Sequence, residues 1–168
     1  SLYSGGETPP EYQISPAPTF KDVIGNPEKY LQGAGSYFYY NLNAWTDSRQ
    51  PACSINLIRQ DYWHDDTGKS VYCQIIVKYN DGLGRELESK QYVTADNTPN
   101  YWRVTGKKVY NNKGKVFAEY LPDFSTKPEY EEPDETGGVP PKIIHYDPLE
   151  REIRIDSSKG FFSKTDFT

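Results

Sequence analysis

The chain has no methionine, only two cysteines and only two histidines in 168 residues, and hydrophobic residues make up just 35% of it. Because the only two histidines, His64 and His145, lie far apart in the sequence, we expect no zinc site. No apolar run is long enough for a membrane-spanning helix, and residues 1–168 contain no signal-peptide pattern. The missing methionine and the start at Ser1 predict a piece of a longer polypeptide or a processed product.

The net charge of −5 is modest, and lysine and arginine are scattered rather than concentrated. Nucleic-acid binding needs a dense basic patch, so we expect no nucleic-acid partner. What the chain does have is 15 tyrosines, 13 glycines and 13 prolines. An aromatic-rich sequence interrupted by Gly and Pro is typical of an all-β protein.

Four short stretches are nearly alike: each has Asp or Asn first and a basic residue fifth, three have Gly fourth, and three follow a tyrosine. Their defining residues are Asp65, Gly68 and Lys69; Tyr79, Asp81, Gly84 and Arg85; Tyr110, Asn111, Gly114 and Lys115; and Tyr146, Asp147 and Arg151. Self-similarity of this kind indicates a fold built by repetition.

The pattern predicts hairpin turns. Asp or Asn opens a type I turn by accepting backbone hydrogen bonds, and Gly in fourth place takes the left-handed conformation that closes the hairpin with a bulge. Glu150 stands in that fourth place in the last stretch and would carry strain at positive φ. The fourth positions (68, 84, 114 and 150) are 16, 30 and 36 residues apart, which predicts an irregular array of antiparallel hairpins.

We expect residues 1–35 to be an irregular Pro- and Gly-rich lead-in and 36–168 to be the β-hairpin segment of a larger chain. Within the lead-in, 22–30 fits one or two helical turns. Residues 46–52 are predicted to be a loop, and 121–141, with five prolines and an acidic run, a long exposed loop. The predicted strands are 36–45, 53–63, 70–79, 85–93, 101–110, 115–120, 142–146 and 151–156, with another beginning at Phe161.

Alternation places Cys53 and Cys73 on inward strand faces. A hairpin centred on residues 66 and 67 would pair Cys73 with position 60, leaving Cys53 roughly 23 Å away at ~3.3 Å per residue. A disulfide needs Cα atoms within about 7 Å. The sequence therefore predicts two buried free thiols and leaves the redox compartment open.

No cofactor, metal or catalytic site is predicted. Turn chemistry explains Asp65 and Asp66 beside His64 better than metal binding does, 82–85 lacks the rest of a phosphate loop, and 129–135 lacks calcium-loop spacing. No Ser-His-Asp signature is present. The serious alternative is a carbohydrate-binding β module that stacks sugars on Trp45, Trp63, Trp102 and the tyrosines; those aromatics otherwise fill the sheet faces.

Residues 79–87 and 146–153 resemble the YD repeats of the Rhs family. More specifically, four collinear segments between residues 30 and 168 resemble the B component of bacterial insecticidal toxin complexes (Tc toxins): 31–40, 81–91, 106–120 and 144–167. Glu150 departs from the repeat, which normally has Gly there.

The resemblance implies a structural role without catalysis. In that family the B and C components form a hollow, curved β-sheet shell, which holds a toxic cargo until the pore-forming A component receives it. The expected partners are the rest of the chain's own B component, the C component with its cargo and, indirectly, the A component. The resemblance implies secretion as part of a toxin complex, without membrane insertion by this segment. The self-cleaving protease belongs to the C component, and no matched segment carries its aspartates. An excised section of such a sheet would have open, aggregation-prone edges.

Overall fold

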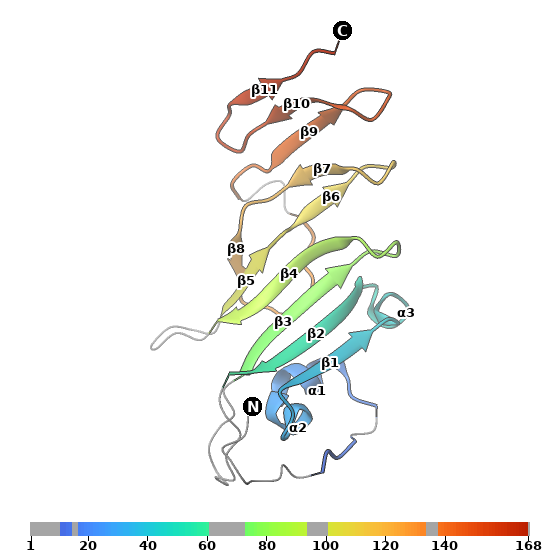
Figure 1. Ribbon diagram of the computed structural model, residues 1–168, viewed down its shortest axis with the longest axis vertical. Helices are drawn as coiled ribbons and strands as arrows, with labels where there is room; N and C mark the ends of the chain where they lie inside the picture. Colours follow the sequence, from blue (N-terminus) through green and yellow to red (C-terminus); the bar gives the residue numbers. More distant parts are fainter. Residues whose placement is uncertain (1–10, 15–16, 61–72, 94–100, 134–137, 168) are drawn as a thin grey trace. The chain divides into compact units, whose positions relative to one another are not determined.

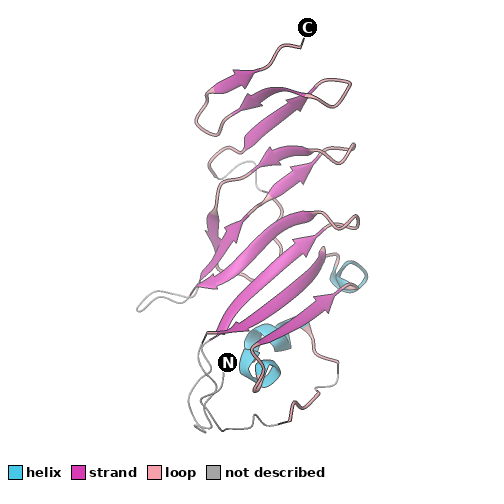
Figure 2. Cartoon of the chain, in the orientation of Figure 1, coloured by secondary structure: helices cyan, strands magenta, loops and turns pink. Residues whose placement is uncertain are grey.

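The structure, a computed structural model, describes residues 11–14, 17–60, 73–93, 101–133 and 138–167 (Figure 1). Antiparallel strands dominate these residues, with three short helices near the N-terminus (Figure 2). The predicted all-β class is therefore confirmed. The chain divides into two compact units, Ser1–Lys78 and Tyr79–Thr168. The predicted division into a lead-in of 1–35 and a hairpin segment of 36–168 stays a prediction.

The first unit carries its strands side by side in the order β1-β2-β3. The β1 and β2 strands are antiparallel, with Tyr37 opposite Leu57 and Asn41 opposite Cys53. Its elements are α1 (Phe20–Gly25), α2 (Pro27–Leu31), β1 (Ser36–Asn41), α3 (Ala44–Ser48), β2 (Ala52–Arg59) and most of β3 (Cys73–Asn80).

Local capping explains the first two helices. The Thr19 side chain accepts a hydrogen bond from the backbone of Asp22, whose carboxylate accepts one from the Thr19 backbone, so a capping box starts α1. Pro27 is tolerated in the first turn of α2, where its missing N–H has no partner to lose. Both helices bury apolar side chains, among them Val23 and Leu31, which are 0% exposed.

The β2 strand shows the predicted alternation. Cys53, Ile55 and Leu57 are buried, and Arg59 on the same face is also buried. The Arg59 side chain donates from Nε to the carbonyl of Ala34 at 3.1 Å, which partly offsets the cost of burying its charge. Sequence reasoning did not foresee this buried arginine.

Both cysteines are free, as predicted, although only Cys53 is fully buried and Cys73 is half-buried. Burial raises the pKa of the Cys53 thiol to about 11, so this sulfur stays protonated at neutral pH.

Two sequence predictions fail around β1. The strand ends at Asn41 rather than 45, and α3 replaces part of the predicted loop; Ala44 is buried and Arg49 ends the helix in the left-handed region at φ 57°. One face of β1 is open, since Phe38 and Tyr40 are 54% and 63% exposed.

The second unit contains the remaining strands in two sheets, with the neighbour orders β4-β5-β8 and β11-β10-β9-β7-β6. Tyr92 lies opposite Trp102 in the first of these sheets, and Ile144 lies opposite Ile155 in the second. The strands are β4 (Glu86–Val93), β5 (Tyr101–Thr105), β6 (Lys108–Tyr110), β7 (Val116–Glu119), β8 (Asp123–Ser125), β9 (Lys142–Tyr146), β10 (Glu152–Asp156) and β11 (Phe162–Lys164).

The predicted strand 101–110 is two strands in two sheets. Gly106 separates β5 from β6 at φ 66°, a conformation that glycine adopts without a Cβ penalty. A Cβ at this position would also lie 3.2 Å from the Glu86 carboxylate. This glycine therefore lets the chain leave one sheet and enter the next.

The predicted long exposed loop also contains structure. Residues 123–125 form β8, which pairs with β5, with Val104 opposite Asp123. The strap, which we define as residues 126–133, follows and contacts side chains of β3 and β4. These contacts are described with the site below.

Candidate functional site

The turn between β3 and β4 has the geometry that its sequence pattern predicts. The Gly84 N–H donates to the Asp81 carbonyl at 3.0 Å, and the Asp81 N–H donates to the Arg85 carbonyl at 2.9 Å. The Asp81 Oδ1 atom accepts from the N–H groups of Leu83 and Arg85 at 2.8 and 2.9 Å. Gly84 has φ 77°. One carboxylate thus organises the whole turn.

The turn from Asn111 to Lys115 repeats this arrangement. The amide oxygen of Asn111 accepts from the N–H groups of Lys113 and Lys115, both at 3.0 Å. Gly114 closes the turn at φ 80°.

The turn from Asp147 to Arg151 has the same backbone hydrogen bonds although its fourth residue is not glycine. Glu150 adopts φ 64°, so the residue that departs from the repeat is forced into the conformation of the glycines. The Asp147 Oδ1 atom again accepts two backbone N–H groups, from Leu149 at 2.8 Å and Arg151 at 2.9 Å. The predicted strain is therefore located at this one residue.

The tyrosines connect each turn to the one before it. The Tyr110 hydroxyl donates to the Glu86 carbonyl at 2.8 Å, and the Tyr146 hydroxyl donates to the Val116 carbonyl at 2.9 Å. Each acceptor lies one residue after the basic residue that ends the preceding turn. Tyr79 binds the strap instead of a preceding turn: its hydroxyl donates to the Pro128 carbonyl at 2.7 Å.

Side chains of the turns also meet directly. The Arg85 Nε atom lies 2.6 Å from Asp81, and its guanidinium lies over the Tyr110 ring, 4.4 Å from the centroid. A Cβ on Gly114 would lie 2.7 Å from Arg85 Nη1, so only glycine leaves room for this approach. Figure 1 shows the three turns on the same side of the second unit.

The next pair of turns is joined more loosely. Lys113 and Lys115 lie 3.9 Å from the Glu150 carboxylate, and Lys113 Nζ donates to the Pro148 carbonyl at 3.4 Å. These groups are about half exposed, so each ion pair contributes little.

One further turn escaped the sequence analysis, and one predicted turn is not described. Ser157 opens a turn that Gly160 closes at φ 81°, and the Ser157 hydroxyl accepts from the Lys159 N–H at 3.1 Å. No tyrosine precedes this turn, and its fifth residue is not basic. The sequence pattern that could have predicted it is Ser followed by Gly three residues later. The predicted turn of Asp65, Gly68 and Lys69 lies outside the described residues.

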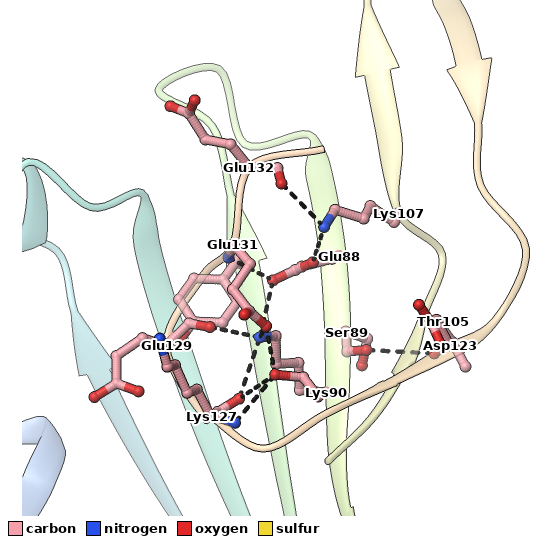
Figure 3. A network of polar contacts seen from close by, with 12 residues as sticks. Glu88, Ser89, Lys90, Thr105, Lys107, Asp123, Lys127, Glu129, Glu131 and Glu132 are labelled. Atoms are coloured by element: carbon pink, nitrogen blue, oxygen red, sulfur yellow. Dashed lines mark hydrogen bonds and ion pairs between the residues drawn. The ribbon is translucent and has the colours of Figure 1, made fainter. Parts of the chain in front are cut away.

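A buried ionic network on β4 was also not predicted (Figure 3). Glu88 and Lys90 are both 0% exposed. Lys90 Nζ lies 2.8 Å from the Glu131 carboxylate and 3.7 Å from Glu88, while Lys107 lies 3.6 Å from the other oxygen of Glu88. Two acidic and two basic side chains thus offset each other on a sheet face where alternation alone would predict apolar residues.

The two carboxylates respond oppositely to this setting. Burial raises the pKa of Glu88 above its usual value, although Lys90 and Lys107 oppose the rise. Burial also acts to raise the pKa of Glu131, but hydrogen bonds from Lys90 and Ser125 outweigh it and hold that pKa below its usual value. Lys90 therefore keeps an ionised partner in Glu131.

Two observations bear on metal binding and on cavities in the described residues. They contain no group of three His, Cys, Asp or Glu side chains placed to hold a metal ion. A cavity of about 470 Å³ lies beside β10 and residues 164–167, lined by charged side chains. Its cations are already paired: Arg151 Nε lies 2.7 Å from Asp147, and Lys164 Nζ lies 2.8 Å from Asp166.

One of the three tryptophans proposed to stack sugars is buried. Trp102 is only 4% exposed and packs against Tyr92, with ring centroids 5.1 Å apart. Trp45 is 61% exposed, with Arg49 over its ring at 5.6 Å, and Trp63 lies outside the described residues.

In the part of the chain that the structure describes, no helix is both long and apolar enough to cross a membrane.

Comparison with known proteins gives structural relatives only. No protein-family model and no curated protein sequence matches the chain. The crystal structure of TcdB2-TccC3 matches with a TM-score of 0.70 and 26% identity, over 80% of this chain and 7% of that chain. TcdB2-TccC3 without its hypervariable C-terminal region matches at 28% identity, over 71% of this chain and 6% of that one, with a TM-score of 0.59.

A third match is the Tc holotoxin pore of Photorhabdus luminescens, with 27% identity, a TM-score of 0.58, and coverage of 72% of this chain and 6% of that chain. The predicted resemblance to the Tc toxins is thereby confirmed, and the chain resembles part of their B and C components. It spans only a small fraction of the length of the chains it matches.

Proposed function

We propose that this chain is a section of the shell wall of a toxin complex. It would belong to the B component and, with the C component, enclose a toxic cargo polypeptide before the A component receives it. The observation that carries this proposal is the match to TcdB2-TccC3 over 80% of the chain with a TM-score of 0.70. The complex would be secreted, as the similarity to a holotoxin pore suggests.

The turn contacts support a wall rather than a reactive site. Tyr110 and Tyr146 each bind the backbone one residue beyond the turn before them. Such links hold successive hairpins in register without a closed hydrophobic core, and this suits a repetitive sheet. We therefore propose a non-catalytic role in which Asp81, Asn111 and Asp147 organise the turns.

Protection of cargo tests the proposal. The full-length B component that contains this chain is co-expressed with its C component, and the purified complex is treated with protease. We expect the cargo in the complex to survive conditions that digest isolated cargo. In the same complex carrying Tyr110→Ala and Tyr146→Ala, the cargo should be digested faster, because two links between hairpins are lost.

Leu83→Ala is the matched control, since this side chain is 79% exposed at a turn tip. Cargo digested equally fast inside the wild-type complex and alone would overturn the shell proposal. Binding to a glycan array, with unprotected cargo, would instead support the carbohydrate alternative.

A further inference from the structure

The strap is bound largely through its main chain. The carbonyl oxygens of three consecutive residues each accept a hydrogen bond from a side chain of the sheet. Lys90 Nζ donates to the carbonyls of Lys127 at 3.2 Å and Glu129 at 2.5 Å, and the Tyr79 hydroxyl donates to that of Pro128 at 2.7 Å. Carbonyl groups are the same in every residue type, so these contacts do not depend on the side chains of the strap.

Two strap side chains also contact the sheet: the Tyr130 ring lies 5.6 Å from the Tyr79 ring, centroid to centroid, and the Glu131 carboxylate makes polar contacts. The Glu131 carboxylate lies 2.8 Å from Lys90 Nζ, and it also accepts from the Ser125 hydroxyl. The Glu131 N–H donates to Glu88 Oε1 at 3.5 Å. Lys90 therefore places all three of its N–H donors on the strap, and Glu88 faces the strap backbone (Figure 3).

Burial is unequal on the two sides of this contact. Glu88 and Lys90 are 0% exposed and Tyr79 is 2% exposed, whereas no residue of the described strap is fully buried. The strap residues 126–133 form no strand and take no part in the pairing of β4 with β5. The strap thus covers the sheet without belonging to it.

We propose that Tyr79, Glu88 and Lys90 form a docking site for an extended polypeptide, and that its occupant is the chain's own strap, which detaches while β4 and β5 stay paired. The site recognises three carbonyls in a row and a carboxylate two residues after the last of them. This inference does not rest on the shell role and stands or falls separately from it.

Hydrogen exchange measured by mass spectrometry on the whole chain tests the proposal. Lys90→Met keeps the length of the side chain and removes the ammonium. We expect the amides of residues 127 and 129–131 (Pro128 has no N–H) to exchange about tenfold faster or more, because the strap loses its hydrogen bonds to a charged group. The amides of 101–105 should keep their protection. Lys142→Met is the matched control, since it removes a surface ion pair with Glu119 in the same unit.

Three further variants keep the test decisive. Lys90→Met leaves Glu88 buried with one charge partner fewer, so the double variant Glu88→Gln/Lys90→Met is measured as well, and should free the strap without an uncompensated carboxylate. Glu131→Gln should speed strap exchange on its own. Lys127→Gln/Glu129→Gln should leave strap exchange unchanged, because their carbonyls remain.

Three results would overturn the proposal. The first is unchanged strap exchange in both Lys90→Met and Glu131→Gln. The second is acceleration of 101–105 together with the strap, which would make the strap part of one cooperative unit. The third is acceleration in Lys127→Gln/Glu129→Gln as large as in Lys90→Met, which would mean that side chains rather than the main chain are recognised.

Discussion

The guanidinium of Arg85 lies over the ring of Tyr110, 4.4 Å from its centroid, and the hydroxyl of the same tyrosine donates to the carbonyl of Glu86 at 2.8 Å. Tyr110 therefore contacts the preceding turn with both its ring face and its hydroxyl. Tyr146 makes the equivalent hydroxyl contact, to Val116, and the turn before it ends in Lys115 rather than an arginine. Tyr110 and Tyr146 thus each precede one turn in the sequence and bind the hairpin of the turn before it.

Removing the hydroxyl of Tyr110 tests the first half of this contact. In Tyr110→Phe the ring remains under Arg85, but the Glu86 carbonyl loses a donor. We expect the free energy of unfolding to fall by about 1 kcal/mol in urea titrations. Tyr40→Phe is the control, since that side chain is 63% exposed, and it should change stability by much less. Equal effects of the two variants would contradict a linking role for the Tyr110 hydroxyl.

Gly84 and Gly114 allow the cost of backbone strain to be measured separately from the cost of side-chain crowding, because both have the same backbone conformation. Gly84 and Gly114 have φ 77° and 80°, but a Cβ on Gly84 meets open space, whereas one on Gly114 lies 2.7 Å from Arg85 Nη1. Alanine at either site should cost about 1–2 kcal/mol through the left-handed conformation. Gly114→Ala should cost more, because it also displaces Arg85 from Tyr110, a contact of about 0.5–1 kcal/mol.

Introducing Arg85→Met into both glycine variants checks the cause of that difference. Without the guanidinium there is no side-chain nitrogen to displace, so the two alanine substitutions should become equally costly in urea unfolding. A difference that persisted in this background would mean that crowding by Arg85 is not its source.

The chemistry of the described turns is local. The first residue, the fourth residue and the backbone between them are adjacent in the chain, so Asp81 and Gly84 carry their own structural information. The turn opened by Ser157 was not predicted, because a serine hydroxyl accepts the backbone hydrogen bond there in place of an aspartate carboxylate, and no tyrosine precedes the turn. The helix α3 was missed because its start at Asn43 has no side-chain capping bond to serve as a signal.

The buried network was beyond local reasoning. In β4 the two buried residues are Glu88 and Lys90, so alternation gives no buried apolar row to recognise. Their burial depends on Glu131 and the strap, more than 35 residues further along the chain. Composition marked the strap as an exposed loop because proline and acidic residues are typical of such segments. It has no strand or helix, and only the tertiary contacts show that it is bound to the sheet.

Glu150 offers a chance to raise stability. It holds φ 64°, and glycine relieves the cost of a Cβ in that region, while the ion pairs it gives up, to Lys113 and Lys115 at 3.9 Å, are exposed. We expect Glu150→Gly to raise the free energy of unfolding by about 0.5 kcal/mol, since greater freedom of the unfolded chain offsets part of the gain. A lower stability that recovered in high salt would show that the ion pairs matter more than the strain.

The aspartate at the head of the last turn makes stability depend on pH. Hydrogen bonds from Arg151, first its backbone N–H and then its side chain, hold the pKa of Asp147 below its usual value of 3.8. A lowered folded-state pKa stabilises the fold above the unfolded pKa, and this contribution is lost as pH falls through the folded pKa. Asp147→Asn keeps the Oδ1 acceptor that Asn111 uses in the equivalent turn.

We therefore expect Asp147→Asn to fold normally at neutral pH and to lose less stability than the wild type on acidification below about pH 4, measured by urea unfolding at a series of pH values. The converse variant, Asn111→Asp, introduces a carboxylate into the same geometry, with Lys115 as the basic residue of that turn. It should become more sensitive to acid than the wild type. If both variants followed the wild-type pH profile, the turn aspartate would not be the source of the acid dependence, and the backbone bonds alone would account for the turn.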